Sequence, residues 1–231
     1  MSRAGRIEII PTCVPLNEAD LSLCARAVSS YSSRIHIDIV DGLFAPACTW
    51  PYSATGKFEA FDLSGAADLQ KEIHLMVKDP LAIGKQFARS GAFRIVGHVE
   101  AFSSANETQR ALLTWRKDGA QEVGLGLLMG TSLDVIEPYI AMIDVVHLMT
   151  IAWIGTQGIP YEPRSVGRIA EFHARYPETS ISIDGGVSES NIIDLVRAGA
   201  QRFGVGSAIL KAKDPAASYA HLKRMAEDAL V

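Results

Sequence analysis

The stretch that decides the fold of this chain is RIHIDIVDG, Arg34–Gly42. Its β-branched residues, followed by a turn residue and a glycine, are typical of a strand that ends at this turn. Because successive side chains of a strand point to opposite faces, His36, Asp38 and Val40 share one face, and three isoleucines occupy the other. Burying an unpaired charge is costly, so this face predicts a partner for the histidine and the carboxylate, such as a metal ion.

Composition and charge narrow the class of protein. The chain has 231 residues, of which 48% are hydrophobic and 21% charged, as in ordinary soluble globular proteins. Its net charge of -4 argues against nucleic acid or an anionic membrane as a partner. No apolar run is long enough to span a bilayer, and Met1–Gly5 holds no signal-peptide core. The odd set of Cys13, Cys24 and Cys48 lacks a CxxC pair, so we expect reduced thiols in a cytoplasmic protein.

Strand-like runs alternate with helix-like segments along the whole chain. The expected strands cover residues 7–11, 34–42, 71–76, 93–99, 122–128, 144–150, 180–183 and 202–205. The expected helices cover residues 17–30, 79–90, 104–118, 132–140, 164–175, 188–198 and 207–230, and residues 43–65 form an irregular segment. This alternation without a linker predicts one α/β domain over residues 1–231, a (β/α)₈ TIM barrel. A doubly wound open sheet is the alternative, but residues 11–15 lack its G-x-G-x-x-G fingerprint.

Polar residues gather at the carboxyl ends of the expected strands, where such barrels carry their chemistry. Strands two, three and seven deliver His36, Asp38, His74 and Asp184. Two imidazoles and two carboxylates can surround one divalent ion, and this donor set suits zinc, iron(II) or manganese better than calcium or magnesium. A single inward histidine is more often a hydrogen-bonded core residue, but four such residues at matching strand ends favour a site.

Other strand-end residues have two interpretations each. His98 and Glu100 on the fourth strand form either a polar rim or a substrate contact. Met76 and Met149 either fill the core or line the site.

Glycine turns end the seventh and eighth strands. The seventh strand runs into Gly185 and Gly186, and the eighth into Gly206 and Ser207. In barrels, the loops at these two places commonly bind a phosphate group, because glycine lets backbone N–H groups approach the anion. Ordinary turns are the alternative, and the occurrence of two such turns at the two expected strands favours a phosphate site.

Taken together, these motifs resemble the ribulose-phosphate 3-epimerases and relatives such as the allulose-6-phosphate epimerases. Residues 36–42 are similar to the family motif H-x-D-x-M-D-G, residues 73–76 to V-H-L-M and residues 98–100 to H-x-E. Residues 148–150 are similar to L-M-S, residues 183–187 to V-D-G-G-V and residues 206–207 to G-S. The resemblance covers nearly the whole chain, with the motifs in order and at compatible spacing.

The resemblance implies an isomerase on a ribulose-phosphate-binding barrel, a cytoplasmic enzyme of the pentose phosphate pathway. It would invert C3 of ribulose 5-phosphate, xylulose 5-phosphate or a related sugar phosphate through an enediolate, with Asp38 and Asp184 as the acid/base pair. The implied cofactor is one zinc, iron(II) or manganese ion held by His36, Asp38, His74 and Asp184. The implied partner is a small phosphorylated sugar, and a homo-oligomer is expected. The implied substrate-binding residues are Thr12, His74, Met76, Met149, Gly155, Gly185, Gly186, Gly206 and Ser207.

The sequence departs from the family pattern around the expected sugar site. Thr12 and Val40 replace a serine and a methionine of the family, and residues 43–47 replace H-F-V-P-N. Residues 152–157 replace the loop N-P-G-F-G-G-Q and keep only Gly155 and Gln157 of it. These changes leave the metal and acid/base residues in place and leave the sugar specificity open.

Two other functions stay open at this stage. A decarboxylase or aldolase on the same kind of barrel usually needs a lysine at the site, and only Lys71 and Lys78 lie near these strand ends. A barrel that binds sugar phosphates without converting them is the third possibility.

Overall fold

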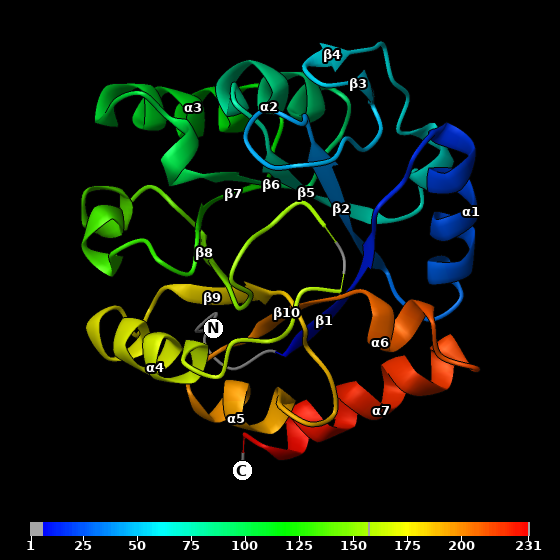
Figure 1. Ribbon diagram of the computed structural model, residues 1–231, viewed down its shortest axis with the longest axis vertical. Coiled ribbons are helices and arrows are strands. Elements are labelled where there is room, and N and C mark those ends of the chain that lie inside the picture. Colours follow the sequence, from blue (N-terminus) through cyan, green and yellow to red (C-terminus); the bar gives the residue numbers. More distant parts are fainter. Residues whose placement is uncertain (1–6, 157, 231) are drawn as a thin grey trace.

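The predicted eight-stranded barrel is confirmed. The computed structural model describes residues 7–156 and 158–230, so the expectations for Met1–Gly5 and for Gln157 lie outside the described residues. Eight parallel strands form a closed ring in the order β1-β10-β9-β8-β7-β6-β5-β2, seen end-on in Figure 1. The strands of the ring are β1 (Glu8–Cys13), β2 (Arg34–Val40), β5 (Gln70–Met76), β6 (Arg94–His98), β7 (Glu122–Leu127), β8 (Val145–Met149), β9 (Ser180–Asp184) and β10 (Arg202–Val205).

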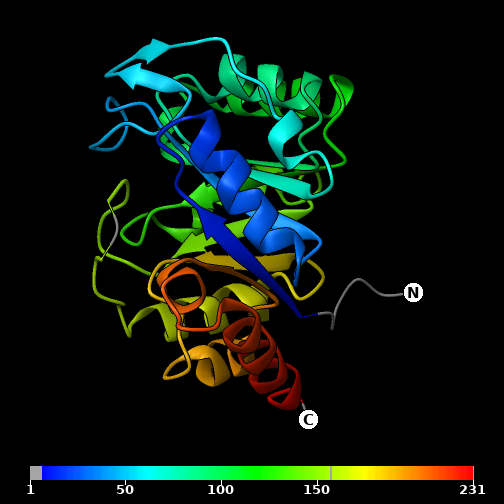
Figure 2. The same ribbon diagram turned by 90° about the vertical axis from the view of Figure 1, so that its right-hand side faces the viewer.

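Helices surround the ring and follow the strands in sequence, as Figures 1 and 2 show. Side chains cap several helix starts, because Asn17, Asp79 and Asp214 each accept a hydrogen bond from a backbone N–H three residues later. The α-helices are α1 (Glu18–Ser29), α2 (Pro80–Arg89), α3 (Ala105–Lys117), α4 (Ser165–Arg175), α5 (Ile192–Arg197), α6 (Ser207–Leu210) and α7 (Pro215–Asp228). The short 3₁₀-helices are η1 (Ser64–Ala66), η2 (Val99–Ala101) and η3 (Leu133–Tyr139).

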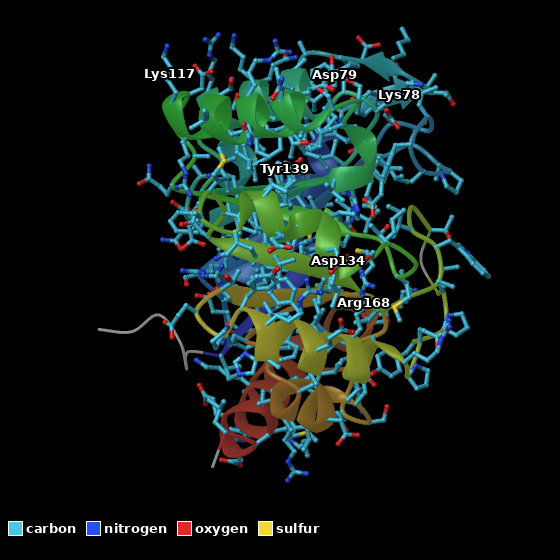
Figure 3. All side chains as sticks on the ribbon, turned by 90° about the vertical axis from the view of Figure 1, so that its left-hand side faces the viewer. Lys78, Asp79, Lys117, Asp134, Tyr139 and Arg168 are labelled. Atoms are coloured by element: carbon cyan, nitrogen blue, oxygen red, sulfur yellow. The ribbon has the colours of Figure 1, made fainter. Side chains whose placement is uncertain are left out.

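Four segments differ from the prediction. The irregular segment 43–65 contains a small antiparallel hairpin of β3 (Tyr52–Ala54) and β4 (Lys57–Phe58) as well as η1. The helix expected over residues 132–140 is the 3₁₀-helix η3, which lies between α3 and α4 on the surface in Figure 3. The helix expected from Ser188 begins at Ile192, because the Asn191 side chain accepts from the Ser188 N–H and closes a turn. The last helix divides into α6 and α7, because Pro215 starts a new helix.

The outward faces of the strands form the apolar layer under the helices. Ile35, Ile37 and Ile39 of β2 are completely buried there, as the alternation in the sequence predicts. Trp115 of α3 is also completely buried and lies so close to α2 that a Cβ atom at Gly84 would come within 2.3 Å of its indole nitrogen. The absence of a side chain at Gly84 therefore allows α2 and α3 to pack this closely.

Replacing Gly84 by alanine is expected to destabilise the fold by about 1–3 kcal/mol, because the rigid indole cannot move aside in a packed core. The matched control is Gly167→Ala in α4, where an added Cβ meets no atom within 4 Å. That change is expected to stabilise the protein by roughly 0.5–1 kcal/mol through helix propensity. Urea unfolding of both variants checks the difference, and equal midpoints would contradict this account of α2–α3 packing.

The inner face of the barrel is polar at the amino ends of its strands. Three arginines and three glutamates meet there in what we call the floor cluster: Glu8, Arg34, Glu72, Arg94, Glu122 and Arg202. Arg94 is only 1% exposed, and its Nε donates to Oε2 of Glu122 at 2.8 Å while Nη1 contacts Glu72. Equal numbers of opposite charges neutralise one another, which is the condition for tolerating buried ions. The floor cluster closes the end of the barrel opposite the carboxyl ends of its strands.

Within residues 7–156 and 158–230, no helix combines the length and apolarity that crossing a membrane requires.

Candidate active site

A pocket of about 220 Å³ opens at the carboxyl ends of the strands. Most residues predicted for the site line it: Thr12, Asp38, Met76, Met149, Gly155, Asp184, Gly185, Gly186, Gly206 and Ser207. His36 and His74 are completely buried and do not line it. Carboxylates therefore face the pocket, and imidazoles lie behind them.

Strand register explains why residues far apart in sequence meet here. Asp38 on β2 lies beside His74 on β5, and Met149 on β8 lies beside Asp184 on β9. Thr150 holds the end of β9 in place, because its backbone N–H donates to the Asp184 carbonyl at 2.9 Å and its Oγ1 to the Gly185 carbonyl at 2.5 Å.

The four predicted metal-binding residues lie close together. Asp38 Oδ1 lies 3.1 Å from Nε2 of His36 and 2.9 Å from Nδ1 of His74. Asp184 Oδ2 lies 3.6 Å from the same His74 nitrogen. Carboxylate oxygens and imidazole nitrogens arranged in this way are donors that zinc, iron(II) and manganese accept, so the residues present fit such an ion.

A third imidazole joins this cluster, and sequence reasoning missed it. One ligand atom from each of His36, His74, His147 and Asp184 can be chosen so that all four lie within 4.8 Å of one another. His147 stands between Val145 and Met149 on the inner face of β8, so the alternation that pointed to Met149 could also have pointed to His147.

Buried partners hold the imidazoles from behind. Nδ1 of His36 lies 2.5 Å from Oε1 of Glu72, which belongs to the floor cluster. Burial by itself lowers the pKa of His36, but hydrogen bonds with Asp38 and Glu72 outweigh it and raise the pKa well above its usual value. Carboxylates that hold the second nitrogen of a histidine fix its tautomer and ring orientation at metal centres.

His98 and Glu100 do not line the pocket. They lie behind His74 instead. Nε2 of His98 lies 2.9 Å from Nε2 of His74, and Nδ1 of His98 lies 3.5 Å from Glu100. Glu100 in turn accepts a hydrogen bond from the Leu128 N–H at 2.8 Å. The structure therefore favours neither a polar rim nor a substrate contact for His98 and Glu100. Instead, this pair supports His74.

The two carboxylates of the pocket have different environments. Burial raises the pKa of Asp38, but hydrogen bonds from His36 and His74 outweigh it and hold the pKa below its usual range. Burial and the nearby charge of Asp38 raise the pKa of Asp184 to about 6. Burial and the neighbouring imidazoles keep the pKa of His147 well below its usual value.

The glycine turns also line the pocket. Gly185 and Gly186 have φ values of +114° and +67°, which side chains rarely adopt, and a Cβ at Gly186 would come within 2.9 Å of Tyr161. Lys211 also lines this pocket and was missed by sequence reasoning, although it follows Ser207 by one helical turn. Thr12 offers a hydroxyl that is buried and has no partner among the described residues.

Part of the pocket wall is apolar. Ile154 and Gly155 of the altered loop after β8 supply part of it, and the other altered loop, residues 43–47, packs behind Gly155, where an added Cβ would come within 2.5 Å of the Pro46 carbonyl. A cluster of buried apolar residues connects these loops to the strand ends: Val40, Ala45, Met76, Met149, Ile151 and Ile154. Met76 and Met149 thus both line the pocket and pack in this cluster.

Residues 8–210 match the model of the family described as "Ribulose-phosphate 3 epimerase family". The chain is 33% identical to a ribulose-phosphate 3-epimerase of Aquifex aeolicus, with 83% of each chain covered. It is 29% identical to the chloroplastic ribulose-5-phosphate-3-epimerase of Arabidopsis thaliana, with 100% of this chain and 82% of the relative covered.

Solved structures share the fold at low sequence identity. The crystal structure of KGPDC from Streptococcus mutans matches with a TM-score of 0.70 at 13% identity, covering 98% of this chain and 100% of that one. An orotidine 5'-phosphate decarboxylase from Pyrococcus horikoshii matches with a TM-score of 0.58 at 17% identity, covering 94% of this chain and 98% of that one. At these identities the likeness supports the barrel architecture alone.

Proposed function

Because this chain belongs to the ribulose-phosphate 3-epimerase family, and is therefore a carbohydrate isomerase, we propose that it is a metal-dependent epimerase inverting C3 of a ketose phosphate. The observation that carries the proposal is the joint placement of Asp38 and Asp184 in one pocket, with His36 and His74 behind them. Glycine turns for a phosphate lie at the same pocket. This combination matches the demands of proton transfer on a phosphorylated sugar.

Inversion next to a ketone requires removal of a C–H proton from one face and delivery of a proton to the other. Asp38 and Asp184 reach the pocket from β2 and β9, which are separated by β1 and β10 in the ring. We assign one carboxylate to each face of the planar enediolate, so that one accepts the C3 proton and the other donates. His36, Asp38, His74 and Asp184 would hold a divalent ion, whose positive charge would stabilise the negative charge of the enediolate.

The remaining pocket residues orient the sugar. The unpartnered Thr12 hydroxyl is available to a sugar hydroxyl, and backbone N–H groups at Gly185, Gly186, Gly206 and Ser207 are available to the phosphate. Met76 and Met149 cover the flat intermediate from the apolar wall and exclude water from it. Gly155 allows its loop to approach Pro46 closely and so closes this wall.

Lysine placement argues against the decarboxylase and aldolase alternatives. Lys71 is buried away from the pocket, where its Nζ donates to the carbonyls of Ala66 and Leu69. Lys78, labelled in Figure 3, does not line the pocket either. Lys211 does line it but follows the Gly206–Ser207 turn, where it suits an anion.

Solvent exchange tests the function directly. The protein, supplied with zinc, iron(II) or manganese, is incubated in D₂O with pentulose, hexulose and tetrulose phosphates, and the products are followed by NMR. We expect one deuterium at C3 of an epimeric product with no loss of carbon. Carbon dioxide release or C–C cleavage would instead indicate a decarboxylase or aldolase. Absence of exchange with every sugar and every ion would favour a barrel that only binds sugar phosphates.

Replacing Lys211 by alanine is expected to raise KM for the phosphorylated sugar about five-fold with little change in kcat, since a pair formed by an exposed charge contributes roughly 1 kcal/mol. Lys213, which is exposed and does not line the pocket, provides the matched control Lys213→Ala. Steady-state kinetics at low and moderate salt measures both. Equal KM values for the two variants would contradict a role of Lys211 at the phosphate end.

The cellular compartment and the oligomeric state of the enzyme remain predictions. Cys13, Cys24 and Cys48 are free thiols, which supports a reducing compartment such as the cytoplasm. A homo-oligomer is expected, and analytical ultracentrifugation of the purified protein checks it.

A further inference from the structure

His147 is a buried imidazole that neither the family motifs nor the proposed mechanism uses. It lies on the inner face of β8 and is completely inaccessible to solvent. Its Nδ1 lies 3.0 Å from Oγ of Ser182 on β9, whereas its Nε2 is buried and has no hydrogen-bond partner among the described residues. Buried polar groups without a partner are rare in folded proteins, so this nitrogen calls for a physical explanation.

The surroundings of this ring point to an ion. Its centroid lies 4.6 Å from that of His74 and 5.6 Å from that of His36, the two histidines of the predicted metal site. A ring nitrogen of His147 lies within 4.8 Å of ligand atoms from both and from Asp184. The Ser182 hydroxyl can accept a hydrogen bond from Nδ1–H, which leaves the lone pair of Nε2 free to bind a metal.

We propose that His147 is an additional ligand of the metal ion, bound through Nε2. The inference rests on the proposed metal dependence and adds a third imidazole to its donor set. His147 does not line the pocket, so it approaches the ion from the barrel interior and leaves the pocket side to the substrate. Imidazole suits zinc and iron(II), whereas carboxylates suit manganese. A third imidazole therefore biases this site toward zinc or iron(II) over manganese.

Metal affinity tests the inference without reference to activity. Zinc and manganese affinities of the wild-type protein and of His147→Leu are measured by competition with a chromophoric chelator. We expect the variant to lose at least about 100-fold in zinc affinity, more than loss of an outer-shell partner typically costs, and about 10-fold or less in manganese affinity. The visible absorption of the Co²⁺-loaded protein is expected to change position and intensity, because the coordination shell loses a nitrogen.

Two further variants keep the result interpretable. Val145→Ala changes an inward-facing, buried residue of the same strand that carries no donor, and it is expected to leave the zinc affinity unchanged. His147→Gln retains polarity and serves if the leucine variant does not fold. The gain in Tm on adding zinc should be smaller for His147→Leu than for the wild-type protein, because the native state of the variant binds zinc less tightly.

The outcomes separate the two proposals. Wild-type protein that binds zinc, together with a His147→Leu variant of equal zinc affinity and unchanged Co²⁺ spectrum, overturns the role of His147 and leaves the epimerase proposal standing. Wild-type protein that binds no divalent ion contradicts the metal dependence and this inference together.

Discussion

Replacing Asp184 by asparagine is expected to lower kcat for epimerisation by about 10²–10⁴-fold, the usual contribution of a positioned acid or base. Asparagine keeps the size of the side chain but neither accepts nor donates the proton in question. Asp38→Asn is expected to have an effect of the same order. Both carboxylates line the pocket, and among its described lining residues there is no third carboxylate to replace either of them.

Exchange experiments make this prediction sharper than a loss of rate. In D₂O, each single variant retains one base and is expected to exchange the C3 proton of only one epimer, without forming the other. Metal content of each variant is measured in parallel, because both residues are also proposed ligands. A variant that retains its metal and most of its activity would refute the assignment of the two carboxylates to opposite faces.

Replacing Arg94 by methionine is expected to destabilise the protein by about 3–5 kcal/mol, because it leaves buried charges without compensation. Arg94 pairs with Glu72 and Glu122 in the floor cluster and is almost completely buried. Its charge is the largest influence holding the pKa of Glu72 below the usual value against the opposing effect of burial. The loss is measured as the free energy of unfolding in urea, with chelator present so that metal binding does not contribute.

The matched control is Arg89→Met. Arg89 also pairs with an aspartate, since its Nε lies 3.0 Å from Asp118, but its side chain is 60% exposed. Exposed pairs contribute at most about 1 kcal/mol, so this variant should unfold near the wild-type midpoint. Similar losses in the two variants would contradict the view that burial makes the floor cluster costly to disrupt.

Much of the barrel could be predicted because local signals agree with the global fold. The alternation in residues 34–40 placed His36 and Asp38 inside and the isoleucines outside, and the structure confirms both faces. The hairpin of β3 and β4 was missed, because two- and three-residue strands leave too short a pattern to recognise.

The parts of the site that escaped prediction depend on contacts between distant strands. His147 stands among apolar neighbours in VVHLM and looks like a single core histidine until β2 and β5 bring His36 and His74 beside it. Lys211 was assigned to a continuous last helix, and only the break before α7 reveals that its turn belongs to the pocket. The floor cluster joins charges from five further strands to Arg34 of β2, and no local pattern connects them.

The sealed floor of the barrel has a consequence for the order of events during turnover. Charged side chains block the amino ends of the strands, and buried imidazoles occupy the space above them. The ion and the sugar must then enter through the same pocket opening. The ion, which binds deeper, would bind before the sugar and dissociate after it. A bound sugar phosphate would block the release of the ion. A chelator should therefore remove the ion more slowly from enzyme that is turning over substrate than from enzyme without substrate.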